Sequence, residues 1–90
     1  MGVEWDPEKA RSNAHKHGVD FADALIALED PNAITIDDPD AVGEARYVSL
    51  GADPLGRVLV TVFTSRGDNL RLISSRRASR QERRRYEESI

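Results

Sequence analysis

The spacing of apolar residues changes along the chain, and the change predicts where helices give way to strands. Between Asp20 and Asp30 the apolar residues recur three and four positions apart, which places them on one side of a helix. Asp20 is a typical N-cap, and the segment Asp30-Pro31-Asn32 is a typical helix stop. The pattern therefore predicts an amphipathic helix whose buried stripe is Phe21, Ala24, Leu25 and Leu28.

A more polar helix is predicted ahead of it, from Pro7 to about His17. Asp6 suits its N-cap, and Gly18 suits its C-terminal end. Histidine titrates nearest to neutral pH, so His17 is the best candidate on this helix for proton transfer, followed by Lys9. The alternative is that His17 only caps the helix C-terminus, where a cation is favoured. One polar face of this helix carries Lys9, Asn13, Lys16 and His17.

The last helix is predicted over Arg80–Ser89 and is almost entirely polar. Ser79 and Glu82 have the spacing of a capping box. A helix with so few apolar residues needs an anchor, and we expect it to dock through Tyr86, Ile90 and the aliphatic stems of its arginines. The alternative role for Tyr86 is to stack on a base of single-stranded RNA. In that case the neighbouring RNA contacts would be Arg80 and Arg83.

Short alternating segments between these helices predict an antiparallel sheet of about four strands. A fifth short strand is predicted at Val3–Trp5. The order strand, two helices, strand meander, helix indicates an α+β fold, and the length indicates one domain over residues 1–90. The amphipathic helix is expected to cover one face of the sheet, and the other face is expected to stay open. The four meander strands are predicted at residues 33–36, 46–50, 57–65 and 70–77.

Side chains alternate between the two faces of a strand, so the two long strands can be divided by face. Arg76 and Arg77 are adjacent, and therefore only one of them lines a given face unless a bulge intervenes. On the first long strand one face carries Val58, Val60, Val62, Thr64 and Arg66, and the other carries Leu59, Thr61, Phe63 and Ser65.

Composition excludes several functional classes. The 90 residues include no cysteine, no apolar run long enough to span a membrane and no apparent targeting segment, so we expect a cytoplasmic protein without a membrane partner. The acidic segment Asp37-Asp38-Pro39-Asp40 is a candidate for Mg²⁺ binding, but its proline favours a solvated turn. No zinc motif and no phosphate-binding glycine loop is present. We therefore expect neither a metal nor a cofactor.

Charge is distributed unevenly along the chain. Residues 1–45 hold eleven acids and three bases, whereas residues 46–90 hold five acids and ten bases, all of them arginine. The planar guanidinium group matches a phosphate with two parallel hydrogen bonds. The second half therefore either forms a surface for a polyanion or supplies salt-bridge partners to the acids of the first half.

Four stretches together resemble the BrnT family of toxins. They are Trp5-Asp6-Pro7-Glu8-Lys9-Ala10 with Asn13; Lys16-His17-Gly18-Val19-Asp20-Phe21 with Ala24; Thr64-Ser65-Arg66-Gly67-Asp68; and Arg71-Leu72-Ile73-Ser74-Ser75-Arg76-Arg77-Ala78 with Glu82, Arg83 and Tyr86. They span nearly the whole chain in the family's order. Ser75, where the family has alanine, is the one departure.

The resemblance implies a RelE-like fold, a ribonuclease activity that arrests translation, and a BrnA-type antitoxin. Such antitoxins carry a ribbon-helix-helix part, so operator DNA would be bound only through the complex. The candidate residues that the resemblance carries over are Lys9, His17, Arg66, Arg71, Arg76, Arg77 and Tyr86.

Cleavage of RNA without a metal uses the 2′-hydroxyl as nucleophile, and the enzyme positions the chain and stabilises charge on the phosphate. We expect Arg66 together with Arg76 or Arg77 to bind phosphate and Arg71 to position the RNA, with His17 or Lys9 transferring the proton. Two other readings use the same residues: a nucleic-acid-binding module without catalysis, and a protein-interaction domain that docks an acidic partner through its last helix.

Overall fold

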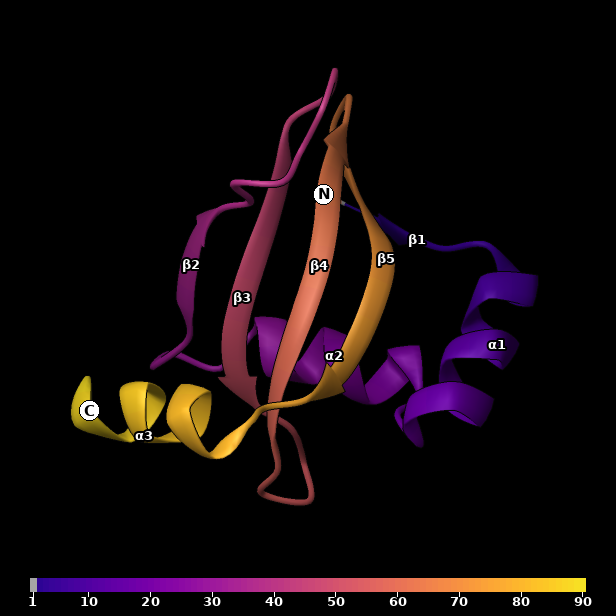
Figure 1. Cartoon of the computed structure of the whole chain (residues 1–90). Coiled ribbons are helices and arrows are strands. Elements are labelled where there is room, and N and C mark those ends of the chain that lie inside the picture. Colours follow the sequence, from indigo (N-terminus) through magenta and orange to yellow (C-terminus); the bar gives the residue numbers. More distant parts are fainter. Residues whose placement is uncertain (1) are drawn as a thin grey trace.

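The computed structural model describes residues 2–90 as one sheet flanked by three helices (Figure 1). The sheet has five strands in the order β1-β5-β4-β3-β2. The α+β class expected from the sequence is confirmed. The elements are β1 (Val3–Glu4), α1 (Pro7–His17), α2 (Phe21–Leu28), β2 (Ile34–Asp37), β3 (Arg46–Ala52), β4 (Val58–Arg66), β5 (Asn69–Arg77) and α3 (Arg80–Glu88).

The predicted meander of four antiparallel strands is present as β2 to β5. The sheet is larger than the expected four strands because β1 joins it beside β5, and β1 runs parallel to β5. In this pairing Val3 lies opposite Leu70 and Glu4 lies opposite Arg71. The short N-terminal strand thus covers the start of β5, which would otherwise be an exposed edge.

Helix α2 covers one face of the sheet, but its buried stripe differs from the predicted one: Ala27 is buried with Phe21 and Ala24, whereas Leu25 and Leu28 are only partly buried. Phe21 and Ala24 pack with Phe63 and Leu72 in the main buried cluster. Tyr47 stacks on Phe63 with ring centroids 5.4 Å apart. At Gly51 the backbone of α2 comes so close that an added Cβ would lie 2.1 Å from the carbonyl oxygen of Ala27.

Helix α1 is attached to the sheet by a polar contact more than by apolar burial. Its only buried residue is Asn13. The Asn13 amide donates to the carbonyl oxygens of Val19 (3.0 Å) and Ser75 (2.8 Å), and its oxygen accepts from the Ser75 amide (3.0 Å). The side chain therefore pairs with Ser75 much as a neighbouring strand would, and it holds α1 at the edge of β5.

Helix α3 begins with the predicted capping box, since Ser79 and Glu82 exchange hydrogen bonds with each other's backbone amides. Tyr86 is its one buried residue, and the Tyr86 hydroxyl donates to the carboxylate of Asp30. Asp30 also accepts hydrogen bonds from the amides of Ala52 and Asn32. The end of α2, the end of β3 and α3 are thereby connected through one carboxylate.

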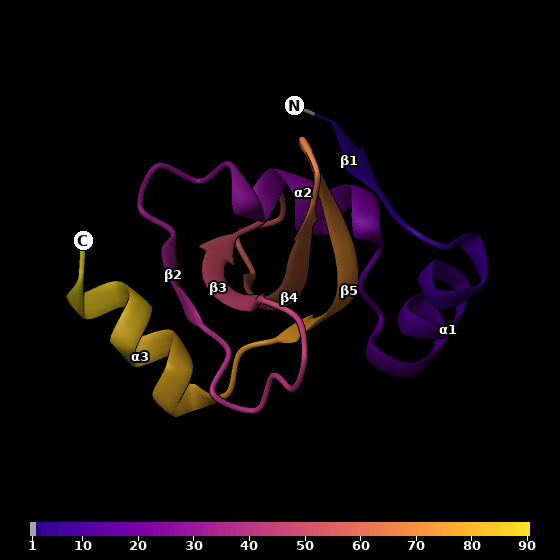
Figure 2. The same cartoon turned by 90° about the horizontal axis from the view of Figure 1, so that it is seen from above.

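The sheet face opposite α2, here called the open face, is not covered by a helix across its centre. Seen from above, α2 lies behind the sheet, while α1 and α3 stand at opposite sides of it (Figure 2). Helix α1 borders the β5 side, and α3 contacts β3. Among residues 2–90, no helix has the length and apolar character needed to cross a membrane.

Candidate functional site

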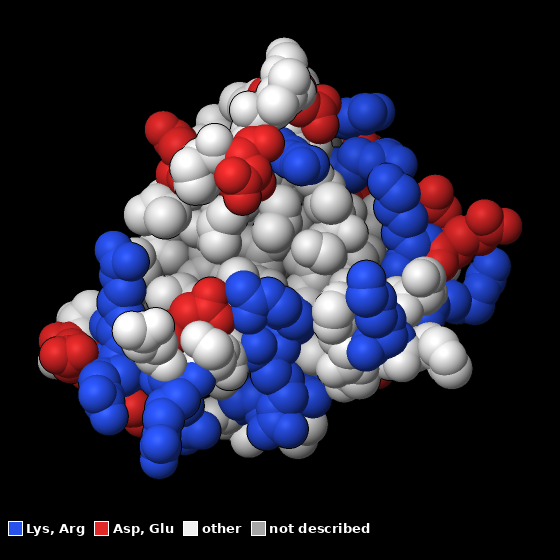
Figure 3. Space-filling view, in the orientation of Figure 1, with Lys and Arg blue, Asp and Glu red and all other residues white. Residues whose placement is uncertain are grey.

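The open face has an apolar centre and a basic border. Figure 3 shows white side chains over the middle strands and lysine or arginine side chains around much of their periphery. The centre forms a shallow hollow, here called the apolar floor, beside which Glu82 and Arg85 of α3 are placed. The apolar floor consists of Ile34, Ile36, Val48, Leu50 and Val60.

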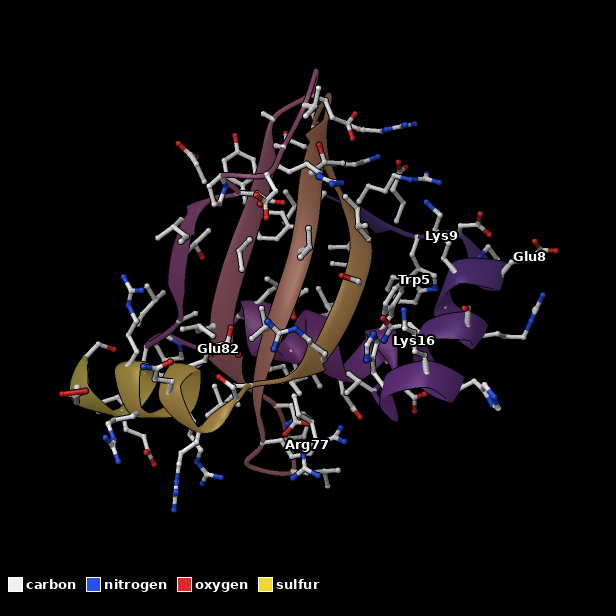
Figure 4. The ribbon with its side chains drawn as sticks, in the orientation of Figure 1. Trp5, Glu8, Lys9, Lys16, Arg77 and Glu82 are labelled. Atoms are coloured by element: carbon white, nitrogen blue, oxygen red, sulfur yellow. The ribbon has the colours of Figure 1, made fainter. Side chains whose placement is uncertain are left out.

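A second hollow lies between α1 and β5. It brings together the polar face that the sequence predicts for α1, so Lys9 and His17 share one site with Lys16 and Ser74. Figure 4 shows Lys9 and Lys16 on the side of α1 that faces β5. This α1 hollow is lined by Lys9, Ser12, Asn13, Lys16, His17, Ile73 and Ser74.

A β-bulge in β5 decides which arginine reaches the open face. The register of β4 and β5 shifts between Val62 and Phe63, because Ile73 has no partner on β4. Beyond the bulge Ser74 pairs with Val62 and Arg76 pairs with Val60, so both lie on the open face. Without the extra residue Arg77 would occupy that face instead. Bulges are frequent next to functional sites, and this one adjoins the α1 hollow.

Arg76 is held by Glu82. The two terminal nitrogens of its guanidinium donate to the two carboxylate oxygens at 2.8 and 3.0 Å. The hydrogen bond from Arg76 is the main reason that the pKa of Glu82 falls to about 2, and the same hydrogen bond raises the pKa of Arg76. Arg76 therefore stays charged and oriented at the border between α3 and the open face.

Arg77 lies on the opposite side of β5. It pairs with Leu59, whose side chain belongs to the face covered by α2. Figure 4 shows Arg77 below the end of the sheet, away from the α1 hollow. The expectation that the two adjacent arginines point to opposite faces is confirmed, and Arg76 is the one on the open face.

Arg71 and Arg66 also lie on the open face, but at increasing distance from Arg76. Arg71 is paired with Thr64 across the strands and forms an ion pair with Glu4 at 3.4 Å. Arg66 is exposed at the β4–β5 turn, six residues from Val60. At about 3.3 Å per residue it is roughly 20 Å from the end that carries Arg76. Arg66 and Arg76 therefore do not converge on one phosphate.

The salt-bridge interpretation applies to part of the arginine-rich half. Three arginines pair with acids of the first half: Arg46 with Asp38, Arg57 with Asp23, and Arg71 with Glu4. On α3 only Arg83 has an ion-pair partner, Glu87 at 3.6 Å. Within the described residues no ion pair is formed by Arg66, Arg77, Arg80, Arg84 or Arg85.

Tyr86 is positioned as an anchor for α3, whereas Ile90, the other expected anchor, is exposed. Its side chain is buried, and the residue is only 6% exposed. Burial and the hydrogen bond to Asp30 raise the pKa of its hydroxyl to about 12. Its ring offers no free surface for stacking on a base, so the docking role is the one the structure supports. Arg80 and Arg83 are exposed on the same helix.

The acidic turn after β2 has a structural arrangement. Asp38 accepts a hydrogen bond from the amide of Asp40 at 2.9 Å and lies 3.7 Å from Arg46. In the part of the chain that the structure describes, no three Asp, Glu, His or Cys side chains are grouped so as to hold a metal ion.

Three residues contribute to the site although the sequence alone indicates no such contribution from them. Asn13 positions α1, Ser74 lines the α1 hollow, and Glu82 holds Arg76. Glu82 is recognisable in the sequence only as part of a capping box. No local pattern marks the bulge at Ile73, because its spacing follows from packing against β4.

Comparison with known proteins gives the following matches. A family model described as the ribonuclease toxin BrnT of type II toxin–antitoxin systems matches residues 5–82. The crystal structure of the Brucella abortus ribonuclease toxin BrnT is similar to this chain, with 29% sequence identity and a TM-score of 0.70. The match covers 89% of this chain and 99% of that one. No curated protein sequence matches significantly.

Proposed function

Because this chain belongs to the BrnT family of ribonuclease toxins of type II toxin–antitoxin systems, we propose that it cleaves RNA in the cytoplasm by a metal-independent reaction on the open face. The observation that carries the proposal is that Arg76 and the α1 hollow lie at the same end of β5, since Arg76 is two residues from Ser74 of the hollow on the same face. This end combines the proton-transfer candidates with a permanent cation. Both are needed for cleavage by the RNA's own 2′-hydroxyl.

In the proposed reaction the 2′-oxygen attacks the adjacent phosphorus while the bond from phosphorus to the 5′-oxygen breaks. The 2′-hydroxyl proton passes to a base of the enzyme, and the leaving 5′-oxygen receives a proton from an acid. The products are a 2′,3′-cyclic phosphate and a free 5′-hydroxyl. Negative charge accumulates on the phosphate oxygens during the step, so cations placed there lower the barrier.

The proposed roles follow from placement along β5. His17 is the proton-transfer group, because it is the imidazole of the α1 hollow, and Lys9 and Lys16 supply positive charge beside it. Arg76, two residues along β5 from Ser74, binds the reacting phosphate. Arg71 and Arg66, farther along the open face, position neighbouring nucleotides. Arg77 and Tyr86 are left out of the proposed site, and Arg80 and Arg83 remain candidates for peripheral contacts.

A type II toxin has a protein antitoxin as its partner. We infer that this partner is of the BrnA type, that its ribbon-helix-helix part binds operator DNA, and that it neutralises the toxin by covering the open face. Occupation of this face would separate Arg76 and the α1 hollow from RNA. The proposal also makes the antitoxin the only route by which the toxin is held on operator DNA.

Cleavage of total cellular RNA by the purified chain in the presence of EDTA tests the proposal. The structure offers two matched pairs of variants: Arg76→Ala with Arg77→Ala, and His17→Gln with His15→Gln. We expect Arg76→Ala and His17→Gln each to lower the cleavage rate by about 100-fold or more, as loss of one charge-stabilising or proton-transfer group does. The other member of each pair should stay within a few-fold of the wild type.

Several outcomes would overturn the proposal. Loss of wild-type cleavage on adding EDTA would contradict metal independence. Equal activity of Arg76→Ala and Arg77→Ala would remove Arg76 from the reacting phosphate. Salt-dependent RNA binding would favour the non-catalytic binding module instead, if neither purified RNA nor the RNA of a translating extract is cleaved.

A further inference from the structure

The open face consists of two chemically different halves. The half over β5 and α1 holds the cations and the imidazole of the proposed RNA site. The half over β2, β3 and β4 is the apolar floor, whose five residues are all aliphatic. Ile36 on this half is 48% exposed although it lies within a strand. Together the five side chains form a contiguous apolar surface with charged residues at its border, which is the kind of surface that marks an interaction site.

The apolar floor has little to offer an RNA chain. Proteins bind single-stranded RNA by pairing cations with phosphates and by stacking aromatic rings on bases. The floor contains neither type of side chain. The nearest aromatic rings of the middle strands, Tyr47 and Phe63, lie on the face covered by α2. An occupant that gains from aliphatic contacts is a protein segment with an apolar side.

The border of the floor is charged on the side of α3. Arg85 lines it directly, and the only acid that lines it, Glu82, is already paired with Arg76. Arg80 and Arg84 on the same helix have no ion-pair partner within the described residues. The positive charge at this border is therefore unbalanced. A segment that crosses the floor and passes α3 gains from carboxylates at that point.

We propose that the apolar floor is the docking surface for an amphipathic segment of the antitoxin, with its apolar side on Ile36 and Val48 and an acidic side chain facing Arg85. The inference rests on the proposed function, because it takes the occupant to be the antitoxin. Arg76 stands at the boundary between the floor and the α1 hollow, since it pairs with Val60 of the floor. A segment docked on the floor therefore blocks the phosphate site without occupying the α1 hollow.

The experiment is a binding titration of the purified toxin with a BrnA-type antitoxin, accompanied by the RNA cleavage assay. Ile36→Ser removes apolar surface from the floor, whereas Val42→Ser makes the same change at a side chain that is 92% exposed outside it. We expect Ile36→Ser to weaken antitoxin binding at least tenfold, as loss of an interface anchor does, and Val42→Ser to change it less than twofold. Both variants should cleave RNA like the wild type.

A second pair tests the charged border independently of the apolar contact. Arg85→Glu reverses the charge that lines the floor, and Arg84→Glu reverses the neighbouring charge of α3 that does not line it. Arg85→Glu should weaken antitoxin binding more than tenfold at low salt, with a smaller loss at high salt. Arg84→Glu should have the smaller effect at both salt concentrations. Circular dichroism of all four variants checks that the fold is retained.

The outcomes separate this inference from the proposed function. Equal antitoxin affinity for Ile36→Ser and Val42→Ser would overturn the docking surface while leaving RNA cleavage as evidence for the enzyme. Loss of cleavage in Ile36→Ser with unchanged antitoxin binding would make the floor part of the RNA site. Self-association of the wild type that disappears in Ile36→Ser would assign the floor to a second copy of the chain. Failure of the wild type to bind the antitoxin would overturn the inference and the partner assignment together.

Discussion

The carboxylate of Glu82 accepts hydrogen bonds from both terminal nitrogens of the Arg76 guanidinium, at 2.8 and 3.0 Å, on the side of the sheet where RNA is proposed to bind. One of its oxygens also accepts from the Ser79 amide at 2.8 Å, which completes the cap of α3. A single acid therefore links the start of the last helix to the orientation of the proposed phosphate ligand. Loss of its charge should affect both.

This link predicts a dependence of stability on acid pH. The pKa of Glu82 is lowered from the usual 4.5 to about 2, chiefly by the hydrogen bond from Arg76. Because the pKa is lowered in the folded state, the Arg76–Glu82 pair contributes fully to the free energy of unfolding above pH 4.5. This contribution is lost as the pH falls from about 4.5 towards 2. Because the pair is partly exposed, we expect the contribution to be no more than about 1 kcal/mol.

Denaturant unfolding across this pH range checks the prediction. Glu82→Gln should flatten the acid limb of the stability curve, while Glu87→Gln should leave it as in the wild type. Glu87 is the matched control because it pairs with Arg83 on the same helix with both side chains more than half exposed. Parallel acid limbs for the wild type and Glu82→Gln would contradict the assigned role of the pair.

Asn13 provides the second prediction. Asn13→Ala removes three hydrogen bonds and leaves the Ser75 amide and carbonyl, together with the Val19 carbonyl, without this partner. Buried polar groups that lose their partners are costly, so the free energy of unfolding should fall by about 2–4 kcal/mol. Ser12→Ala, at an exposed position of the same helix, should change it by less than about 0.5 kcal/mol. Similar unfolding midpoints for the two variants would show that α1 is held by other contacts.

The sequence predicts those parts of this fold whose causes are local. The limits of α1 follow from Asp6, Pro7 and Gly18, and the capping box of α3 follows from Ser79 and Glu82. The meander follows from alternation and turn residues, and the stripe of α2 identifies the covered face of the sheet. Each of these features is decided by residues a few positions apart.

The remaining features depend on contacts between distant segments. The parallel pairing of β1 with β5 joins residues 67 positions apart, such as Val3 and Leu70. The bulge at Ile73 exchanges the faces of Arg76 and Arg77, although strict alternation places Arg77 with Arg71. The candidate polar face of α1 could be predicted because a helix brings its members together. Its location beside Ser74 could not, since it depends on how Asn13 binds the edge of β5.

Gly51 provides the third prediction, which concerns the contact between α2 and the sheet. A Cβ at this position would lie 2.1 Å from the Ala27 carbonyl oxygen and 3.0 Å from its carbonyl carbon, both in the backbone. Gly51→Ala therefore forces α2 away from β3, and we expect it to lower the free energy of unfolding by about 1–3 kcal/mol or more. Urea denaturation measures the change.

Two positions away, Ser49 is the matched control for this substitution. Its side chain is buried, and its hydroxyl has no hydrogen-bond partner within the described residues. Ser49→Ala should therefore be neutral or slightly stabilising, because it removes an unsatisfied polar group from the interior. A Gly51→Ala variant as stable as Ser49→Ala would mean that α2 does not pack as closely as the structure has it.

The salt dependence of RNA binding gives the fourth prediction, which tests the bulge without relying on catalysis. Each phosphate contact with a single strand contributes about 0.7 to the slope of log affinity against log salt concentration, through release of bound counterions. Arg76 lies on the open face and Arg77 on the other face of the same strand. Arg76→Ala should reduce the slope by about 0.7, and Arg77→Ala should reduce it by much less. The measurement uses RNA with 2′-O-methyl groups, which lacks the nucleophile of the proposed reaction and therefore stays intact. Equal slopes for the two variants would mean that RNA does not bind preferentially to the open face of β5. A larger effect of Arg77→Ala would place the RNA on the other face of the strand.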